Sequence, residues 1–374
     1  MTEILPLYII CLVFAVLSHR YSYYNDRLER YVRKDRFFYT FLILFAVVFA
    51  GLRRNYNDTY AYILGYNNLD VSTGVFSGID WSIGEYPFFN LLNRFMKKTG
   101  VSAQSFLMIY SALSIGISLW FIQKYTNNIP LSVFLFFATG YYCFSFGAVK
   151  QCTATAFCLV GIDRLLRKRV IRFFLWVAVG TLFHPFAAMF FICPFLTFSP
   201  WTAPTYLMII LCAGGGYTLQ RWLGSVISFL SVLGVDYDVS TLHSEGVNIF
   251  RVLVLWAPVA LSFLAARFWA QNRNKAHNLI MNLSILSAEL MFIALFGNPI
   301  YLGRLANYFL VFQAISIPYI LDNFEISSKL LLKISTVTGY ICYSVYDNLL
   351  NGYTFNESFS RITLWKYLGD MFSI

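Results

Sequence analysis

Residues 103–122 read AQSFLMIYSALSIGISLWFI, a stretch without a charged side chain. A helix of about 20 apolar residues is long enough to cross the hydrocarbon core of a bilayer. The whole chain has this character, since 58% of its 374 residues are hydrophobic and only 12% are charged, against about 25% in an average soluble protein. So few charges could not cover a soluble globule, and the composition also excludes a disordered chain and a disulfide scaffold. The sequence predicts a polytopic integral membrane protein.

Similar apolar runs recur along the chain, and we predict an all-α fold with about twelve transmembrane helices. The run at 204–235 is the least regular, because Gly214-Gly215-Gly216 can kink a helix or admit a close neighbour. The expected spans lie near residues 4–18, 37–52, 103–122, 131–148, 151–166, 173–195, 204–220, 222–235, 251–270, 278–296, 304–321 and 331–346. Residues 1–374 are expected to form one transmembrane domain, with a partly helical outer loop at 52–102, a second outer loop at 236–250 and an amphipathic tail at 347–374.

The distribution of basic residues sets the expected orientation. Lys and Arg gather in three short connections, at 19–36, 164–172 and 267–275. Cytoplasmic loops collect such residues, so we expect both termini to lie outside. The net charge of +10 is explained in this way, without nucleic acid as a partner. The first apolar run, 4–17, has neither a basic n-region nor a small-residue cleavage site, and we interpret it as a retained helix.

In this topology several cations fall at the outer ends of spans, where the distribution of charge disfavours them. One explanation is snorkelling, in which a long side chain reaches the lipid headgroups. Five such residues on one face favour a shared anionic ligand instead, and arginine forks match phosphate oxygens. The sequence therefore predicts a diphosphate site built from some or all of Arg53, Arg54, Lys150, Arg251 and Arg304.

The outer loops add carboxylates and aromatic rings. The first loop carries Asp58, Asp70, Asp80 and Glu85 among five aromatic residues able to stack on sugar rings, Tyr60, Tyr62, Tyr66, Trp81 and Tyr86. A belt of aromatic residues at the membrane interface is the alternative explanation for the rings, and a helix N-cap is the alternative for Asp58. The second loop offers His243 and Glu245 shortly before Arg251.

Two ionisable residues fall inside predicted spans. His184 precedes Pro185, which opens a helix locally because proline has no N–H, and Glu289 stands in the apolar segment SILSAELMFIALF. Ionisable groups within a membrane usually face a cavity or a partner, although a histidine bonded to a carbonyl needs no such role. The rise per residue places both about 16 Å from the cytoplasmic end of their spans.

Several short motifs occur in a fixed order along the chain. They are FAGLRRNYNDTYAY at 49–62, Glu85-Tyr86, Lys150-Gln151, LFHPFAA around His184 and GRLANYF at 303–309. This ordered set resembles the EpsG-like branch of the Wzy-type polysaccharide polymerases, which assemble capsule, exopolysaccharide or O-antigen chains. The similarity covers about residues 45–320. Where that family usually has Arg-Gln, this chain has Lys150-Gln151, which keeps the charge but loses the bidentate fork.

The resemblance implies a membrane glycosyltransferase at the outer face of the bacterial cytoplasmic membrane. Its reaction moves a growing glycan from undecaprenyl diphosphate to a lipid-linked repeat unit. The implied ligands are the undecaprenyl diphosphate-linked oligosaccharide and membrane lipid, with a chain-length regulator protein as a further partner. The resemblance implies no cofactor and no metal.

The expected roles follow from the chemistry of that reaction. Cations stabilise the charge that develops on the departing diphosphate, a role assigned to Arg53, Lys150, Arg251 and Arg304. A carboxylate must take the proton of the acceptor hydroxyl. Asp58 is the first choice and Glu85 the second, by analogy with membrane glycosyltransferases that place a base in an early outer loop, an analogy compatible with a GT-C-like architecture. His184 and His243 are alternative bases. Residues expected to bind the glycan or support the site are Gln151, His243, Glu245 and Tyr308.

Three other classes fit parts of the same pattern. An O-antigen ligase would also bind a lipid diphosphate, but it typically carries a much larger late outer loop than 236–250. A flippase or secondary transporter would place its cations in a cavity at the membrane midplane, with repeat symmetry. A membrane acyltransferase would need a reactive histidine on the acyl route, for which only His184 is suitable.

Overall fold

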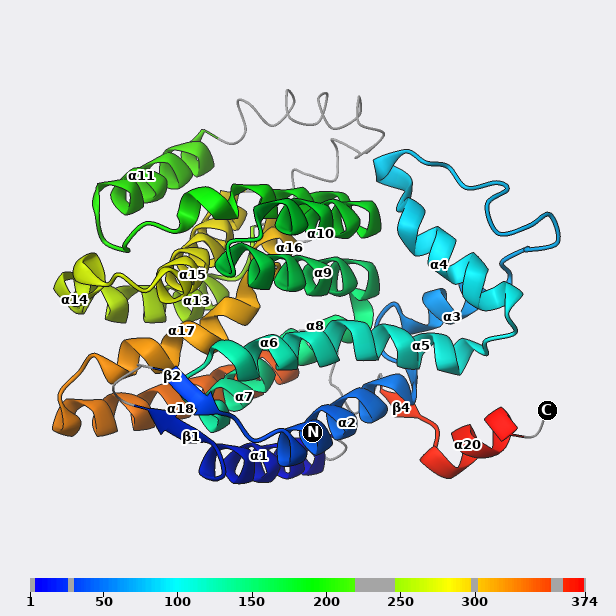
Figure 1. Cartoon of the computed structure of the whole chain (residues 1–374), viewed down its shortest axis with the longest axis horizontal. Coiled ribbons are helices and arrows are strands. Elements are labelled where there is room, and N and C mark those ends of the chain that lie inside the picture. Colours follow the sequence, from blue (N-terminus) through cyan, green and yellow to red (C-terminus); the bar gives the residue numbers. More distant parts are fainter. Residues whose placement is uncertain (1–3, 26–29, 219–245, 297–301, 351–358, 373–374) are drawn as a thin grey trace.

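The chain folds into a bundle of helices that run mostly along the long axis of the molecule (Figure 1). The computed structural model describes residues 4–25, 30–218, 246–296, 302–350 and 359–372. The helices of the first half are α1 Leu5–Arg20, α2 Phe37–Gly51, α3 Thr59–Asn67, η2 Ile83–Glu85, α4 Pro87–Lys98, α5 Ala103–Ser111, η3 Ala112–Gly116, α6 Ile117–Tyr125, α7 Ile129–Ala138, α8 Tyr141–Gly147 and α9 Val149–Leu166. Those of the second half are α10 Val170–Phe183, η4 Pro185–Leu196, α11 Ala203–Tyr217, α13 Ile249–Leu264, α14 Ala266–Gln271, α15 Lys275–Ile293, η6 Ala294–Phe296, α16 Leu302–Asn307, α17 Leu310–Asp322, α18 Ile326–Leu350 and α20 Leu364–Phe372.

Strands are few and short, so the predicted all-α class is confirmed in its main point. β1 (Tyr23–Asn25) pairs with β2 (Arg30–Arg33) in an antiparallel hairpin between α1 and α2. β3 (Arg53–Asn55) pairs with β4 (Ser360–Arg361), and this contact ties the start of the 52–102 segment to the C-terminal segment. The 52–102 segment is partly helical, as predicted, because it contains α3 and α4.

The predicted number of spans is not confirmed. Among the described residues, Ala103–Tyr125 and Lys275–Phe296 are long and apolar enough to cross a membrane, and α7 with α8, bent by 47°, would be a third span. The other apolar helices at predicted spans are shorter, with 10–17 residues each, and include α1, α2, α11 and α13. The predicted span 222–235 lies outside the described residues.

The prediction of one continuous span at 173–195 is wrong. The rings of Phe174 in α10 and Phe191 in η4 stack with centroids 5.8 Å apart, whereas a straight helix would separate these positions by about 25 Å. The chain therefore reverses between them, at His184, whose backbone is extended (φ −159°, ψ 122°). Pro185 explains the break, because its ring disfavours a helical conformation for the residue before it.

The bundle has two distinct ends, which we name by what they carry. The loop end holds α3, α4 and the rest of the 52–102 segment, on the right of Figure 1. At the opposite end, the basic end, the ammonium of Lys34 donates to the carbonyls of Gln123, Lys124 and Thr126 and so closes the C-terminus of α6. His184 ends α10 at the loop end, which corrects the expectation that it lies deep within a span.

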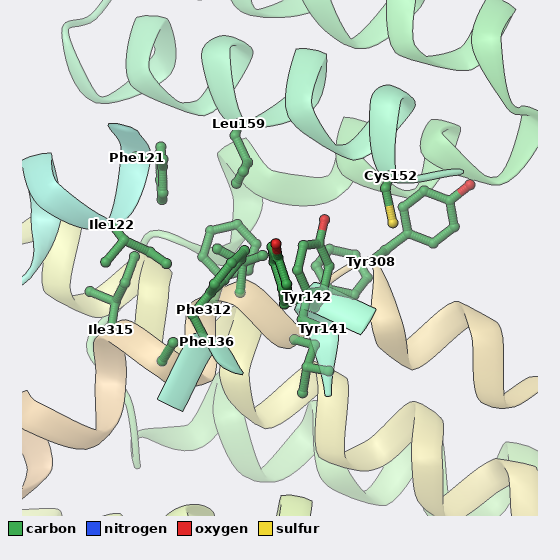
Figure 2. Packing of buried hydrophobic residues seen from close by; sticks show 14 of the residues in the cluster. Phe121, Ile122, Phe136, Tyr141, Tyr142, Cys152, Leu159, Tyr308, Phe312 and Ile315 are labelled. Carbon is green, nitrogen blue, oxygen red and sulfur yellow. The ribbon is translucent and has the colours of Figure 1, made fainter. Parts of the chain in front are cut away.

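Aromatic side chains fill the centre of the bundle (Figure 2). Phe121 of α6 meets Phe312 of α17 edge to face, with ring centroids 5.8 Å apart. Tyr142 of α8 is fully buried and donates its hydroxyl to the carbonyl of Ala46 in α2 at 2.8 Å. Tyr308 closes this core toward the loop end, so the packing that holds α17 in place also positions a residue of the candidate site.

Candidate functional site

Lys150, on the first turn of α9, is the centre of a group of side chains at the loop end. The bend between α7 and α8 brings the chain back to start α9 beneath the 52–102 segment. The Lys150 ammonium lies 3.7 Å from the centroid of the Tyr86 ring and 5.2 Å from that of Phe89. The carboxylate of Glu85 is close enough to act on it electrostatically. The two motifs predicted on Glu85-Tyr86 and Lys150-Gln151 are therefore in contact.

Tyr86 holds this contact through an unusual backbone. Its φ of 53° places it in the left-handed region, which a bulky residue adopts only when its surroundings compel it. Pro87 starts α4 directly afterwards, and its fixed φ suits the first position of a helix. The Tyr86 ring thus lies between Lys150 and His184, whose ring centroid is 5.6 Å away.

His184 and Tyr308 form a polar pair on the other side of Tyr86. The Tyr308 hydroxyl lies 2.6 Å from His184 Nδ1, and the Tyr308 side chain is buried. His184 stands at the break between α10 and η4, and Tyr308 lies between α16 and α17, so this bond links the two breaks in the chain. Both Lys150 and Arg304 are near enough to interact electrostatically with this imidazole.

Arg304 joins the group from α16, about 150 residues further along the chain. Gln151 donates its side-chain amide to the Arg304 backbone carbonyl at 2.7 Å, so α9 and α16 are fixed to each other at this point. The Arg304 side chain itself is exposed. Two cations therefore lie within electrostatic range of one histidine.

Tyr62 of α3 connects Asp58 to these cations. Burial raises the pKa of the Tyr62 phenol, and the nearby Asp58 carboxylate raises it further, while a backbone hydrogen bond at Lys150 and the charge of Arg304 lower it. Asp58 occupies the N-cap position of α3, yet its side chain makes no capping hydrogen bond. The helix expected from the capping alternative exists, but the exposed carboxylate is not used to cap it.

The sequence that forms this site matches the model of a known family. The model of the EpsG family matches residues 36–360, which is most of the chain. The chain belongs to the EpsG family. This confirms the resemblance drawn from the motifs, and membership indicates a Wzy-like polysaccharide polymerase of the glycosyltransferase type, in a membrane. No curated protein and no solved structure matches the chain.

Arg53, predicted to bind the diphosphate, has a different environment in this EpsG-family chain. Its side chain is 1% exposed, and its guanidinium donates to Ala50 O at 2.6 Å, Ser111 Oγ at 3.0 Å, Thr59 Oγ1 at 3.1 Å and Phe146 O at 3.2 Å. The guanidinium also lies 5.2 Å from the centroid of the Phe146 ring. These contacts join α2, α3, α5 and α8. In this conformation Arg53 holds the base of the 52–102 segment instead of facing the site.

Arg251, also predicted to bind the diphosphate, is engaged with a partner that the sequence had not indicated. Its Nη2 lies 2.9 Å from Asp347 Oδ1, and both side chains are partly exposed. Asp347 comes from α18 and acts electrostatically on Tyr56, two residues before Asp58. The pair is therefore on the flank of the site. His243 and Glu245 lie outside the described residues.

Proximity in sequence could not have grouped these residues, because they come from five separate segments of the EpsG-family fold. The motif order did single out Glu85, Lys150, Gln151, His184, Arg304 and Tyr308. Two features were not foreseen: the Tyr86 ring between Lys150 and His184, and the Arg251–Asp347 pair. The dipeptide Tyr86-Pro87 could have indicated a helix start at this point, because proline often begins a helix. No local sequence pattern marks Asp347 as the partner of Arg251.

Proposed function

We propose that this chain is a polysaccharide polymerase that transfers a growing glycan from undecaprenyl diphosphate to a lipid-linked repeat unit, at the outer face of the bacterial cytoplasmic membrane. One observation supports this above all. Lys150 and Arg304 both act electrostatically on His184, Glu85 acts on Lys150, and Asp58 and Arg304 both act on Tyr62, so these charged groups share one region of the molecule. Cations beside carboxylates are what a displacement at a sugar carbon with a diphosphate leaving group requires.

The reaction can be written with its bonds. The acceptor hydroxyl attacks the anomeric carbon of the donor glycan, and the bond from that carbon to the diphosphate oxygen breaks. Undecaprenyl diphosphate leaves with the bonding electron pair, and Lys150 and Arg304 stabilise its negative charge. The hydroxyl proton passes to Asp58, which we assign as the base, with Glu85 as the second candidate.

Other residues hold these groups in place. His184, which is bonded to Tyr308 and within electrostatic range of both cations, orients the diphosphate. His184 and His243 are the further candidates for the base. Gln151 fixes the backbone at Arg304. Arg53 is a positioning residue, because its donors go to protein oxygens. The ring of Tyr86 packs against the Lys150 ammonium and holds it in place.

The proposal is tested with the purified chain and a synthetic undecaprenyl diphosphate-linked repeat unit as the only substrate. We expect a ladder of longer glycans and release of undecaprenyl diphosphate, without a nucleotide sugar. Passage of the intact lipid-linked unit across a vesicle membrane, with no longer glycan and no released lipid, would identify a flippase-like transporter instead. Transfer to an unrelated acceptor in a single step would identify a ligase.

Cysteine labelling tests the orientation. Gly65 in α3 has open space where a Cβ would stand, so Gly65→Cys fits at the loop end, and Gln271→Cys places an exposed thiol at the basic end. The native cysteines are replaced first, because Cys342 is exposed. An impermeant thiol reagent should label Gly65→Cys in intact spheroplasts and Gln271→Cys only after permeabilisation. The opposite result would place the site on the cytoplasmic face and contradict the proposed substrate route.

A further inference from the structure

A large cavity opens at the basic end, away from the candidate site. Its volume is about 2060 Å³, and it lies among the ends of α2, α6, α9, α14, α15 and α17. The function proposed above makes no use of it. Four cationic side chains line it, and they come from three separate connections: Lys34 and Arg36, Lys124, and Arg167. Asp35 and Asp322 are the acidic residues in the same lining.

The positive charge around the cavity is only partly neutralised by the protein. The carboxylate of Asp163 is almost fully buried and forms ion pairs with three cations. They are Lys124, Arg167 at 3.2 Å and Arg164 at 3.7 Å. Asp322 already pairs with Lys329. The surplus charge favours an anion at this end.

The rim of the cavity is aromatic and open. Phe37 is 65% exposed, Tyr21 64% and Phe268 54%, and all three line the cavity. In a membrane protein such rings lie at the interface between headgroups and acyl chains. A soluble phosphate compound would leave them uncovered, whereas the acyl chains of a lipid would pass over them.

We propose that this cavity binds the phosphate-bearing headgroup of an anionic phospholipid, with Arg36 and Arg167 as ligands of its oxygens. Basic pockets between helices at the cytoplasmic side of membrane proteins suit such headgroups. The site is distinct from the one that handles the lipid-linked glycan. It is joined to it by α9, which carries Lys150 at one end and Arg167 just past the other.

Binding is measured on the full chain in a neutral detergent, with phosphatidylglycerol and phosphatidylcholine as probes. We expect clear preference for phosphatidylglycerol, and about tenfold weaker binding of it for Arg36→Gln, the loss of one charge-assisted hydrogen bond. Arg167→Gln should also weaken binding severalfold, and Asp163 keeps Lys124 and Arg164 as partners in this variant. Arg273→Gln, a change at an exposed arginine of the same end outside the lining, is the matched control.

Two results would overturn the proposal. One is equal affinity for the two lipids, or unchanged phosphatidylglycerol binding in both Arg36→Gln and Arg167→Gln. The other is that glycerol 3-phosphate, which has the phosphate but no acyl chains, binds as tightly as the lipid, which would make this a site for a soluble ligand. This experiment measures lipid binding and not polymerisation. A negative result would therefore contradict the lipid site but not the proposed polymerase activity, and a chain that does not polymerise could still bind the lipid.

Discussion

Arg304→Ala is expected to stop polymerisation almost completely, with a loss of at least about a hundredfold in the rate of glycan transfer. Its guanidinium is exposed beside His184 and Lys150, and nothing else in the described site offers a fork for two diphosphate oxygens. Cells that carry the variant should accumulate single repeat units on the lipid. The measurement is the length distribution of the polymer, with the purified assay as its counterpart.

Two companion variants decide what the loss means. Arg304→Lys should recover little activity, because a point charge lacks the bidentate geometry. Lys98→Ala removes a cation from the same 52–102 segment, at an exposed position whose ammonium only reaches the Val71 carbonyl at 3.5 Å, and should be near neutral. Normal polymer length in Arg304→Ala, at normal expression, would mean that this arginine merely reaches the lipid headgroups.

The class of fold could be predicted because it depends on sums over many residues. Apolar runs, scarce charge and clustered cations require helices in a membrane whatever the details of packing. The reversal at His184 could not be predicted from hydropathy, because Phe186 to Phe195 is as apolar as the helix before it. Pro185 marked the break, but a proline fits a kinked helix as well as a turn. Only the packing of Phe174 on Phe191 decides between them.

The candidate site was predicted as residue types and not as contacts. Charge at an outer helix end identified Arg53, Arg251, Arg304 and Lys150 alike, since a sequence shows where a cation begins but not which way it points. The structure separates them by their partners. Arg53 donates to backbone and hydroxyl oxygens of its own scaffold, and Arg251 pairs with Asp347, whereas Lys150 and Arg304 both act electrostatically on His184. Long-range partners of this kind leave no local pattern.

Asp58→Asn is expected to lower the rate of polymerisation by about 10²- to 10⁴-fold, the usual contribution of a general base. The substitution keeps the size and shape of the side chain, but an amide cannot take a proton from a sugar hydroxyl. It should leave folding intact, because Asn is about as good an N-cap as Asp and the Asp58 side chain makes no capping bond in any case. The measurement is the transfer rate in the purified assay, with binding of the lipid-linked substrate followed separately and expected to be unchanged.

Glu85→Gln is the matched comparison, because Glu85 lies in the same segment and acts on Lys150 rather than on Tyr62. If Glu85 only tunes the ammonium, its loss should weaken substrate binding modestly and leave the transfer rate of bound substrate close to wild type. A fast Asp58→Asn enzyme together with a slow Glu85→Gln enzyme would move the base to Glu85. Full activity in both variants and in the double variant would exclude Asp58 and Glu85 as the base. His184, which is bonded to Tyr308 and within electrostatic range of both cations, would then be the group to change next.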